Sequence, residues 1–444
     1  MSNVEWNDEG NGVLTWKKHI YRVNVHQEEG DTAPLDTDRL RKRIEPWLSA
    51  VFQSEHLSLL VGSGFTKAIA AVTEAKAAGM DRFSFTGELA EFSRAAADDS
   101  ARGMARGEAN FEDDLRTASE LLRGLDILSD ERAAEWREQI NDALIAYLKS
   151  IMEGERLLAD AFSRDSLNAI SARNLLISFL LSFASRAASR ERLNIFTTNY
   201  DRLIEFGCDL AGLRVIDRFV GALKPVFRTS RLNIDLHYNP PGMRGEPRYL
   251  EGVIRFFKLH GSIDWRAERS QIRRYGIPFG PSVDTPYLPS NPIESVMIYP
   301  NAAKDIETSQ FPYAELFRDF ASTICRPNSV LVTYGYGFGD DHINRVIRDM
   351  LTVPSSHLVI ISYDNPGERI KRFYNDIGHS AQITLLIGKH FGNLPVLVEN
   401  YLPKPAIDLI SAREMVLLEG RRDAFNSEES HTPTPEATKA EKED

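Results

Sequence analysis

The stretch Asn194-Ile195-Phe196-Thr197-Thr198-Asn199-Tyr200-Asp201 sets the architecture expected for this chain. Its apolar run ends in threonines, an asparagine and an aspartate, and apolar residues return at helical spacing from Leu203. This pattern predicts a buried strand that runs into a helix, with polar side chains at the carboxyl end, where open α/β sheets bind ligands. Asn199 and Asp201 are therefore candidate ligand-binding residues. The alternative is that Thr198 or Asn199 caps the next helix.

A glycine-rich turn follows another predicted strand. Residues 56–61 form the strand, and Gly62-Ser63-Gly64-Phe65-Thr66 comes directly after it. Glycines let the backbone approach a phosphate there, and the helix that starts near Thr66 offers unpaired N–H groups to an anion. The chain lacks the full G-x-G-x-x-G spacing and any P-loop Gly-Lys-Ser/Thr. A plain tight turn is the alternative.

A histidine stands at the end of a third predicted strand. Residues 254–259 form this strand, which leads into His260-Gly261. The turn exposes the imidazole, so that it is free to act on a ligand. A single histidine in this position is also compatible with a structural role.

Two later turns complete the set. The strand predicted at 329–334 ends in Gly335-Tyr336-Gly337, which suits a phosphate or ribose, and Asp341 is expected to cap the following helix. Asp364 follows the strand predicted at 357–361, where ribose-binding acids are common in such folds. A plain turn residue before proline is the alternative for Asp364.

Composition narrows the class of protein. The chain has 444 residues and a formal net charge of -11, which disfavours broad attraction to nucleic acids or membranes. Its two cysteines, Cys208 and Cys325, cannot build a four-cysteine zinc site or a disulfide framework, and no metal is expected. The N-terminus has no signal pattern, and the apolar run 175–183 is too short to span a bilayer. A cytoplasmic location is expected.

The pattern along the chain predicts three parts. Residues 1–45 are expected to form an N-terminal extension, interpreted as a β-hairpin with an oligomer contact. Residues 46–405 are expected to form the main α/β domain, and residues 420–444 a disordered acidic tail. The segment of about 71–190 is almost wholly helical and is interpreted as an insertion between the first two strands of the sheet. Its acidic residues, such as Glu108, Glu112 and Asp113, are interpreted as a solvated face. The strand at 383–387 is predicted to lie at the edge of the sheet.

In their order, the four turns at Gly62, Thr198, His260 and Gly335 resemble the NAD-binding core of the sirtuin family, in the form carried by bacterial sirtuin-like defence proteins. The sirtuin pattern has a glycine loop, a Thr-x-Asn-x-Asp turn, a His-Gly strand end and a late glycine turn. The resemblance covers roughly residues 50–395 and implies a Rossmann-like parallel sheet of sirtuin type. It also implies NAD+ as the substrate.

The resemblance assigns roles to the matching positions. His260 would be the general base, and Asn199 and Asp201 would hold the nicotinamide ribose and the carboxamide end. These three are the predicted catalytic residues. The predicted cofactor-binding residues are Gly62, Ser63, Gly64, Phe65, Thr66, Thr198, Gly335, Tyr336, Gly337 and Asp364.

Two departures from the sirtuin pattern bear on the activity. Protein-deacylating sirtuins resemble one another in a four-cysteine zinc module, which two distant cysteines cannot supply. The late turn is Gly-Tyr-Gly instead of the Gly-Thr-Ser usual in deacylases. The resemblance implies that, without an acyl acceptor, the same pocket can still break the nicotinamide–ribose bond and pass the ribosyl cation to water. The prediction is an NAD+ hydrolase (NADase) that releases nicotinamide and ADP-ribose.

The resemblance also implies a biological setting. It suggests an NAD-depleting effector in antiphage defence, acting by abortive infection, as a homo-oligomer with a HerA-type hexameric ATPase as partner. The alternatives are a non-catalytic module that senses NAD or ADP-ribose, and a protein deacylase or ADP-ribosyltransferase. A nuclease is disfavoured because no metal-ligand cluster stands out among the acidic residues.

Overall fold

The computed structural model describes residues 14–15, 19–23, 36–77, 79, 81–103, 109–164, 166–186, 190–230, 234–238, 248–269, 271–282, 288–289, 291–292, 296–298 and 311–404. The chain divides into units 1–403 and 404–444, and the first unit holds every helix and strand described below. The tail predicted at 420–444 lies outside the described residues.

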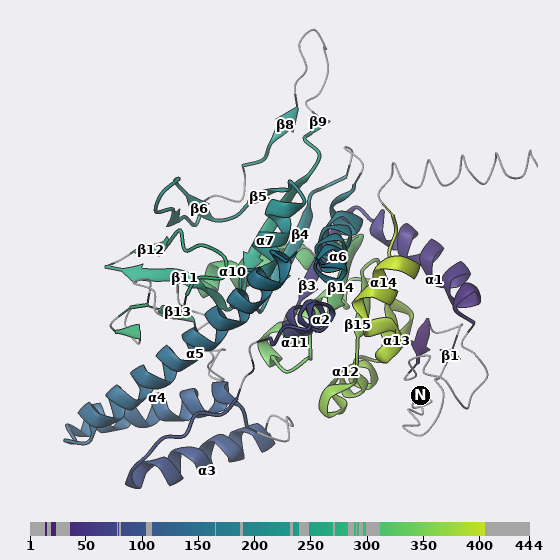
Figure 1. Ribbon diagram of the computed structural model, residues 1–444. Coiled ribbons are helices and arrows are strands. Elements are labelled where there is room, and N and C mark those ends of the chain that lie inside the picture. The colour runs from purple at the N-terminus through teal and green to yellow at the C-terminus, as the bar shows by residue number, and fades with distance from the viewer. Residues whose placement is uncertain are drawn as a thin grey trace, which may run out of the picture. The chain divides into compact units, whose positions relative to one another are not determined.

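A nine-stranded sheet forms the centre of the first unit (Figure 1). Its strands lie in the order β1 (Leu14–Thr15), β2 (Ile20–Arg22), β16 (Ile383–Ile387), β15 (His357–Ser362), β14 (Ser329–Tyr334), β3 (His56–Val61), β4 (Leu193–Thr197), β10 (Val253–Lys258) and β5 (Arg214–Ile216). Every neighbouring pair is parallel except β1 with β2. The predicted fold class, a Rossmann-like parallel α/β sheet with a helical insertion and an N-terminal β extension, is confirmed.

The strand order shows how the chain winds. From β3 the chain adds β4 and β5 on one side, and β10 then takes the place between them. The chain returns to place β14 against the other side of β3 before adding β15 and β16. This is the doubly wound order in which ligands bind where the direction of winding changes, here between β3 and β14. The carboxyl ends of β3 and β14 therefore mark the expected binding edge.

Two hydrophobic cores cover the two faces of the sheet, because alternate strand residues point to opposite sides. In β3, Leu59 belongs to the first core and Leu60 to the second. The helices of the first core are α1 (Thr37–Phe52), α2 (Ser63–Thr73), α6 (Leu167–Ala184), α7 (Leu203–Leu210), α13 (Lys389–Gly392) and α14 (Leu394–Asn400). Those of the second core are α10 (Tyr313–Ile324), α11 (Asp341–Met350) and α12 (Arg369–Ile377).

A helical unit lies between β3 and β4 in the sequence. Helices α3 (Glu88–Gly103), α4 (Phe111–Leu128) and the first part of α5 (Ala133–Phe162) pack side by side beyond the sheet (Figure 1), and α4 and α5 share a core of their own. The end of α5 and all of α6 instead join the first core of the sheet. The boundaries predicted for the insertion stay a prediction, although this packing limits the separate unit to α3, α4 and most of α5.

The acidic start of α4 is buried, so its interpretation as a solvated face is wrong for Glu112 and Asp113. The reason is capping: the Asn110 side chain accepts a hydrogen bond from the Asp113 amide, and the Asp113 carboxylate accepts one from the Asn110 amide. Asp114 beside them is held by Arg82 at 2.5 Å. Glu108 lies outside the described residues.

Two further predictions, the edge position of β16 and the role of the apolar run in α6, are compared with the structure next. β16 is not an edge strand, because β2 of the N-terminal hairpin pairs with its outer side. Among the described helices, α6 is long and apolar enough to cross a membrane by length and composition. Its Leu176, Phe179 and Leu180 side chains are nevertheless packed in the first core, so α6 serves the fold.

Smaller sheets complete the fold. A five-stranded sheet has the order β13 (Val296–Ile298), β11 (Gly261–Glu268), β12 (Gln271–Arg274), β7 (Val226–Phe227) and β6 (Phe219–Val220), and β8 (His237–Tyr238) pairs with β9 (Arg248–Tyr249). β11 starts at Gly261, immediately after His260. His260 is thus held between the central sheet and the five-stranded sheet.

Candidate active site

The four predicted turns lie at one edge of the central sheet. They follow β14, β3, β4 and β10, which are consecutive parallel strands. Backbone hydrogen bonds also join the turns: the Ile263 amide donates to the Tyr200 carbonyl at 3.3 Å. The fold therefore brings together the elements that carry the sirtuin-like motifs.

The two glycine turns are packed against each other at the change in winding. The Gly64 amide donates to the Gly335 carbonyl at 3.0 Å, and the Gly62 amide donates to the Tyr334 carbonyl at 3.1 Å. A Cβ on Gly62 would lie 2.4 Å from the Gly335 oxygen. Gly335 has a φ of +63°, and a Cβ there would lie 2.6 Å from the Phe65 nitrogen. The glycines are thus required for close backbone packing, whatever ligand the edge binds.

Asn199 presents an unused acceptor. Its Nδ2 donates to the Gly62 carbonyl and to Thr66 Oγ1, both at 3.2 Å. Its Oδ1 is buried and has no hydrogen-bond partner among the described residues. A buried carbonyl oxygen without a donor costs about 1–3 kcal/mol, so a ligand hydroxyl or water that donates to it would be bound with that gain.

Asp201 has protein donors on both carboxylate oxygens. Thr66 Oγ1 donates to Oδ2 at 2.9 Å, and the Leu203 amide at the start of α7 donates to Oδ1 at 3.1 Å. The side chain of Asp201, and not that of Thr198 or Asn199, therefore accepts from the first amide of α7, whereas Arg202 at the N-cap position makes no capping hydrogen bond with its side chain. Thr66 connects the Asn199 amide to the Asp201 carboxylate, which favours a positioning role for this aspartate.

His260 is buried beside a histidine that the sequence analysis did not single out. Its Nε2 lies 3.3 Å from Nε2 of His342, the second residue of α11. The side chain of Asp340 completes a group whose ligand atoms all lie within 4.8 Å of one another. Asp340 is also the residue before α11, so the cap predicted at Asp341 is wrong by one position, and the side chain of Asp340 makes no capping hydrogen bond.

The remaining predicted residues divide into exposed and packed positions. Ser63 and Asp364 are exposed at the binding edge, and the Thr198 amide donates to the Val61 carbonyl at 3.2 Å. Phe65 is fully buried against Phe179 of α6. The ring of Tyr336 lies in the second core, and its hydroxyl donates to Asn344 Oδ1 at 3.0 Å. Burial raises the pKa of Tyr336 well above its usual range.

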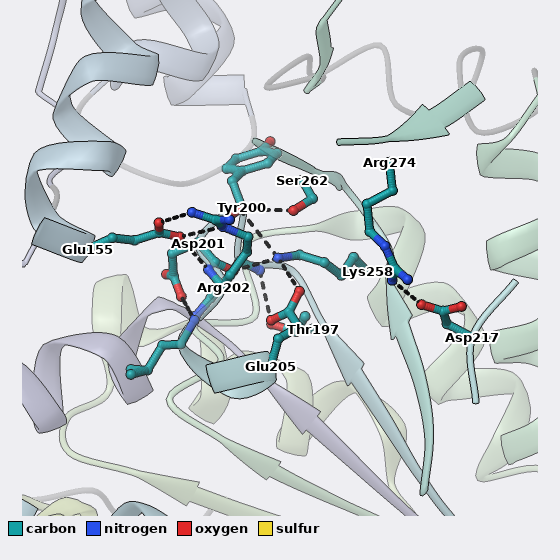
Figure 2. A network of polar contacts seen from close by, with 12 residues as sticks. Glu155, Thr197, Tyr200, Asp201, Arg202, Glu205, Asp217, Lys258, Ser262 and Arg274 are labelled. Atoms are coloured by element: carbon teal, nitrogen blue, oxygen red, sulfur yellow. Dashed lines mark hydrogen bonds and ion pairs between the residues drawn. The ribbon is translucent and has the colours of Figure 1, made fainter. Parts of the chain in front are cut away.

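The buried ammonium group of Lys258 contacts the backbone of the turn after β4 (Figure 2). Lys258 Nζ donates to the Asp201 carbonyl at 2.5 Å and forms an ion pair with Glu205 at 3.0 Å. Arg202, in the same turn, pairs with Glu155 of α5 at 2.5 Å. Burial raises the pKa of Glu155, whereas its Arg202 partner lowers it. These contacts fix the backbone that carries Asn199.

A cavity of about 540 Å³ lies next to this network. Its lining includes Glu205, Lys258 and Asp264, with Trp265 and Phe219 as aromatic walls. None of the predicted catalytic or cofactor-binding residues lines it. This cavity is therefore distinct from the predicted catalytic and cofactor-binding site.

The match to a known family covers three of the four turns at this edge, those after β4, β10 and β14, and not the turn after β3. Residues 193–381 match the family model of the SIR2-like domain. The matched range begins at the first residue of β4 and includes Asn199, His260 and Gly335. It supports a sirtuin-like family and is consistent with NAD-related activity, since SIR2-like domains are in general NAD-dependent enzymes. No curated protein matches the chain significantly.

Proposed function

We propose that this protein is an NAD+ hydrolase that cleaves the nicotinamide–ribose bond and releases nicotinamide and ADP-ribose. The observation that carries the proposal is the pairing of an unused buried acceptor, Asn199 Oδ1, with a buried histidine, His260, on adjacent strand ends within the SIR2-like match. A binding module needs shape and donors, whereas hydrolysis also needs a group that takes a proton. Both are present here.

The departure of nicotinamide needs little assistance from the protein. Nicotinamide leaves as a neutral molecule from a cationic ring, so no strong acid is required. The transition state resembles an oxocarbenium ion, as in other glycosyl transfers. The site must then orient the ribose and deliver one water to the anomeric carbon.

Asn199 and His260 have different roles in this reaction. Asn199 Oδ1 accepts a hydrogen bond from the water or from a ribose hydroxyl, because its Nδ2 is already committed to Gly62 and Thr66. His260 takes the proton that the water loses as it attacks. Asp201 acts through Thr66, which it holds at 2.9 Å.

The contact of the helical unit with the turn after β4 supports the proposal that the enzyme is held inactive until infection. Tyr200, between Asn199 and Asp201, packs in the core shared by α4 and α5, with its ring 5.9 Å from that of Tyr147. Movement of this unit would therefore displace the turn that carries Asn199. Such a connection suits an enzyme whose activity must be held back until infection.

The cellular setting is proposed from the resemblance to bacterial defence proteins. We infer a cytoplasmic homo-oligomer that works with a HerA-type hexameric ATPase and depletes NAD+ during abortive infection. Exposed apolar side chains on the helical unit, Phe92, Ile127 and Leu128, support contacts with other chains. Mass photometry of the chain with and without an ATPase encoded beside it tests both associations.

The deciding experiment follows NAD+ cleavage by chromatography. The purified chain is incubated with NAD+, alone and with any neighbour-encoded ATPase, together with His260→Ala and Asn199→Ala. Nicotinamide release by the wild type that both substitutions lower by about 100-fold or more supports the proposal. If NAD+ binds tightly but stays intact under every condition, the protein is a sensor of NAD and the proposal is wrong.

A further inference from the structure

The group formed by His260, His342 and Asp340 comes from separate stretches of the chain. His260 ends the loop after β10, whereas Asp340 and His342 flank the first residue of α11. Both imidazoles are buried, with exposed fractions of 5% and 7%, and Asp340 is half-buried. Burial of two facing imidazole nitrogens requires that they share either a proton or a cation, because two protonated rings would repel each other.

The separation of the two nitrogens suits a tetrahedral metal ion. Imidazole nitrogens lie about 2.05 Å from Zn²⁺, so two of them on a tetrahedral ion are about 3.3 Å apart. The Nε2 atoms of His260 and His342 are 3.3 Å apart. A hydrogen bond in which one ring N–H donates to the other ring nitrogen is the alternative at this distance. A carboxylate oxygen of Asp340 lies within 4.8 Å of the ligand nitrogens of both histidines, which makes Asp340 the third candidate ligand.

We propose that His260, His342 and Asp340 bind Zn²⁺ or a similar borderline divalent cation, with one position left open. Two imidazoles and one carboxylate favour zinc over magnesium or calcium, which prefer oxygen ligands alone. Aromatic rings border the pair: that of Tyr200 is centred 6.3 Å from His260, and that of Phe317 is 4.8 Å from His342. These rings limit rotation of the imidazoles and keep bulk water away, which keeps the two nitrogens facing each other.

The bound ion would switch the site off. A metal on Nε2 of His260 occupies the lone pair that the proposed hydrolysis uses to take a proton. Removal of the ion frees the base. This consequence rests on the proposed NAD+ hydrolase, whereas the metal site itself does not. A toxic hydrolase would then be held inactive while the ion is bound.

Metal binding is tested first, without reference to activity. The full chain, without a histidine affinity tag, is dialysed against a chelator and titrated with Co²⁺, which reports tetrahedral coordination by its visible absorption. We expect one equivalent of Co²⁺, displaced by Zn²⁺, and an affinity at least 10-fold lower in Asp340→Asn and in His342→Ala. Asp341→Asn, the same change one residue later and on an exposed side chain, should bind as the wild type does. Absence of the absorption band in a folded wild-type chain overturns the site.

The effect on activity is measured next. Rates of NAD+ cleavage are recorded over a series of Zn²⁺ concentrations, each divided by the rate of the same variant in chelator. We expect Zn²⁺ to inhibit the wild type and Asp341→Asn alike, and Asp340→Asn to need at least 10-fold more Zn²⁺. Equal inhibition of Asp340→Asn and the wild type would show that this group does not mediate the inhibition. Stoichiometric Co²⁺ binding, together with no NAD+ cleavage by the metal-free chain in chelator, alone or with any neighbour-encoded ATPase, would retain the metal site and reject the hydrolase.

Discussion

The turns after β4 and after β14 flank β3 at the same edge of the sheet, yet they use their side chains in opposite ways. After β4, the polar side chains of Asn199 and Asp201 face α2 and leave one acceptor open. After β14, the rings of Tyr336 and Phe338 turn away into the second core. The first turn offers side-chain chemistry to a ligand, whereas the second offers the close approach of its backbone.

Replacing an asparagine by alanine in the turn after β4 and in α11, where Asn344 contacts the turn after β14, gives the largest contrast. Asn199→Ala removes the open acceptor and should lower kcat/KM for NAD+ by about 100-fold or more. It also removes the Nδ2 hydrogen bonds to Gly62 and Thr66, which should lower the free energy of unfolding by about 1–3 kcal/mol. Asn344→Ala removes an amide that accepts from Tyr336 and donates to the Phe338 carbonyl at 3.1 Å. It should lower the free energy of unfolding by about 1–3 kcal/mol and change the activity per folded molecule little. Denaturant melts and steady-state kinetics separate the two, and equal loss of activity in both variants would contradict the contrast.

Backbone packing in the turn after β14 is tested by Gly335→Ala. Its φ of +63° disfavours any side chain, and the added Cβ would meet the Phe65 nitrogen. We expect a loss of about 3 kcal/mol in the free energy of unfolding. Gly378→Ala is the matched control, because Gly378 has a φ of +68° and open space around its Cβ position. It should cost about 1 kcal/mol, and a similar cost for the two variants would show that backbone strain alone is responsible.

Thr66 tests whether Asp201 acts through a bridge. Thr66→Val keeps the shape of the side chain but removes the hydroxyl that joins Asn199 and Asp201. It should lower NAD+ cleavage by about 10-fold and stability by about 1–2 kcal/mol. Thr66→Ser retains the hydroxyl and should recover most of the rate. If Thr66→Ser is as impaired as Thr66→Val, the methyl group matters and the bridge does not.

The ion pair of Lys258 with Glu205, next to the turn after β4, predicts that the free energy of unfolding depends on pH. Burial raises the pKa of Glu205 from 4.5 to about 7, and the Lys258 ammonium opposes this only in part. Because the folded state holds this proton more tightly, the stability that Glu205 contributes is complete below pH 4.5 and is lost as the pH rises through 7.

Glu205→Gln should abolish this component. The side chain of Glu205 is 30% exposed. The pH-dependent part of its contribution to the free energy of unfolding is therefore expected to be only about 1 kcal/mol. The stability of the wild type relative to Glu205→Gln should fall between pH 4.5 and pH 7, as measured by denaturant unfolding. A relative stability that rises over this interval would contradict the raised pKa.

The sequence predicts the strands and turns that local patterns determine. It does not predict contacts between residues that are far apart in the chain. The apolar run before Thr198 and the glycines at 62 and 335 predict strands and turns because their local chemistry allows few other structures. His342 lies 82 residues from His260, and only the packing of α11 beside the end of β10 joins them. The stretch Asp340-Asp341-His342 was a visible signal, since it follows a strand end, but capping by Asp341 accounted for it equally well. The outer neighbour of β16 likewise comes from the distant N-terminus.

The smallest expected effect concerns Tyr336, which the sirtuin resemblance assigns to cofactor binding. Its hydroxyl donates to Asn344 inside the second core, so Tyr336→Phe removes one buried hydrogen bond and should cost about 1 kcal/mol. If the side chain serves packing alone, KM for NAD+ stays within about 2-fold of the wild type in steady-state kinetics, since about 0.4 kcal/mol separates a 2-fold change from none. A KM raised 10-fold at unchanged stability would place the phenol on the nucleotide and remove the distinction between the two turns.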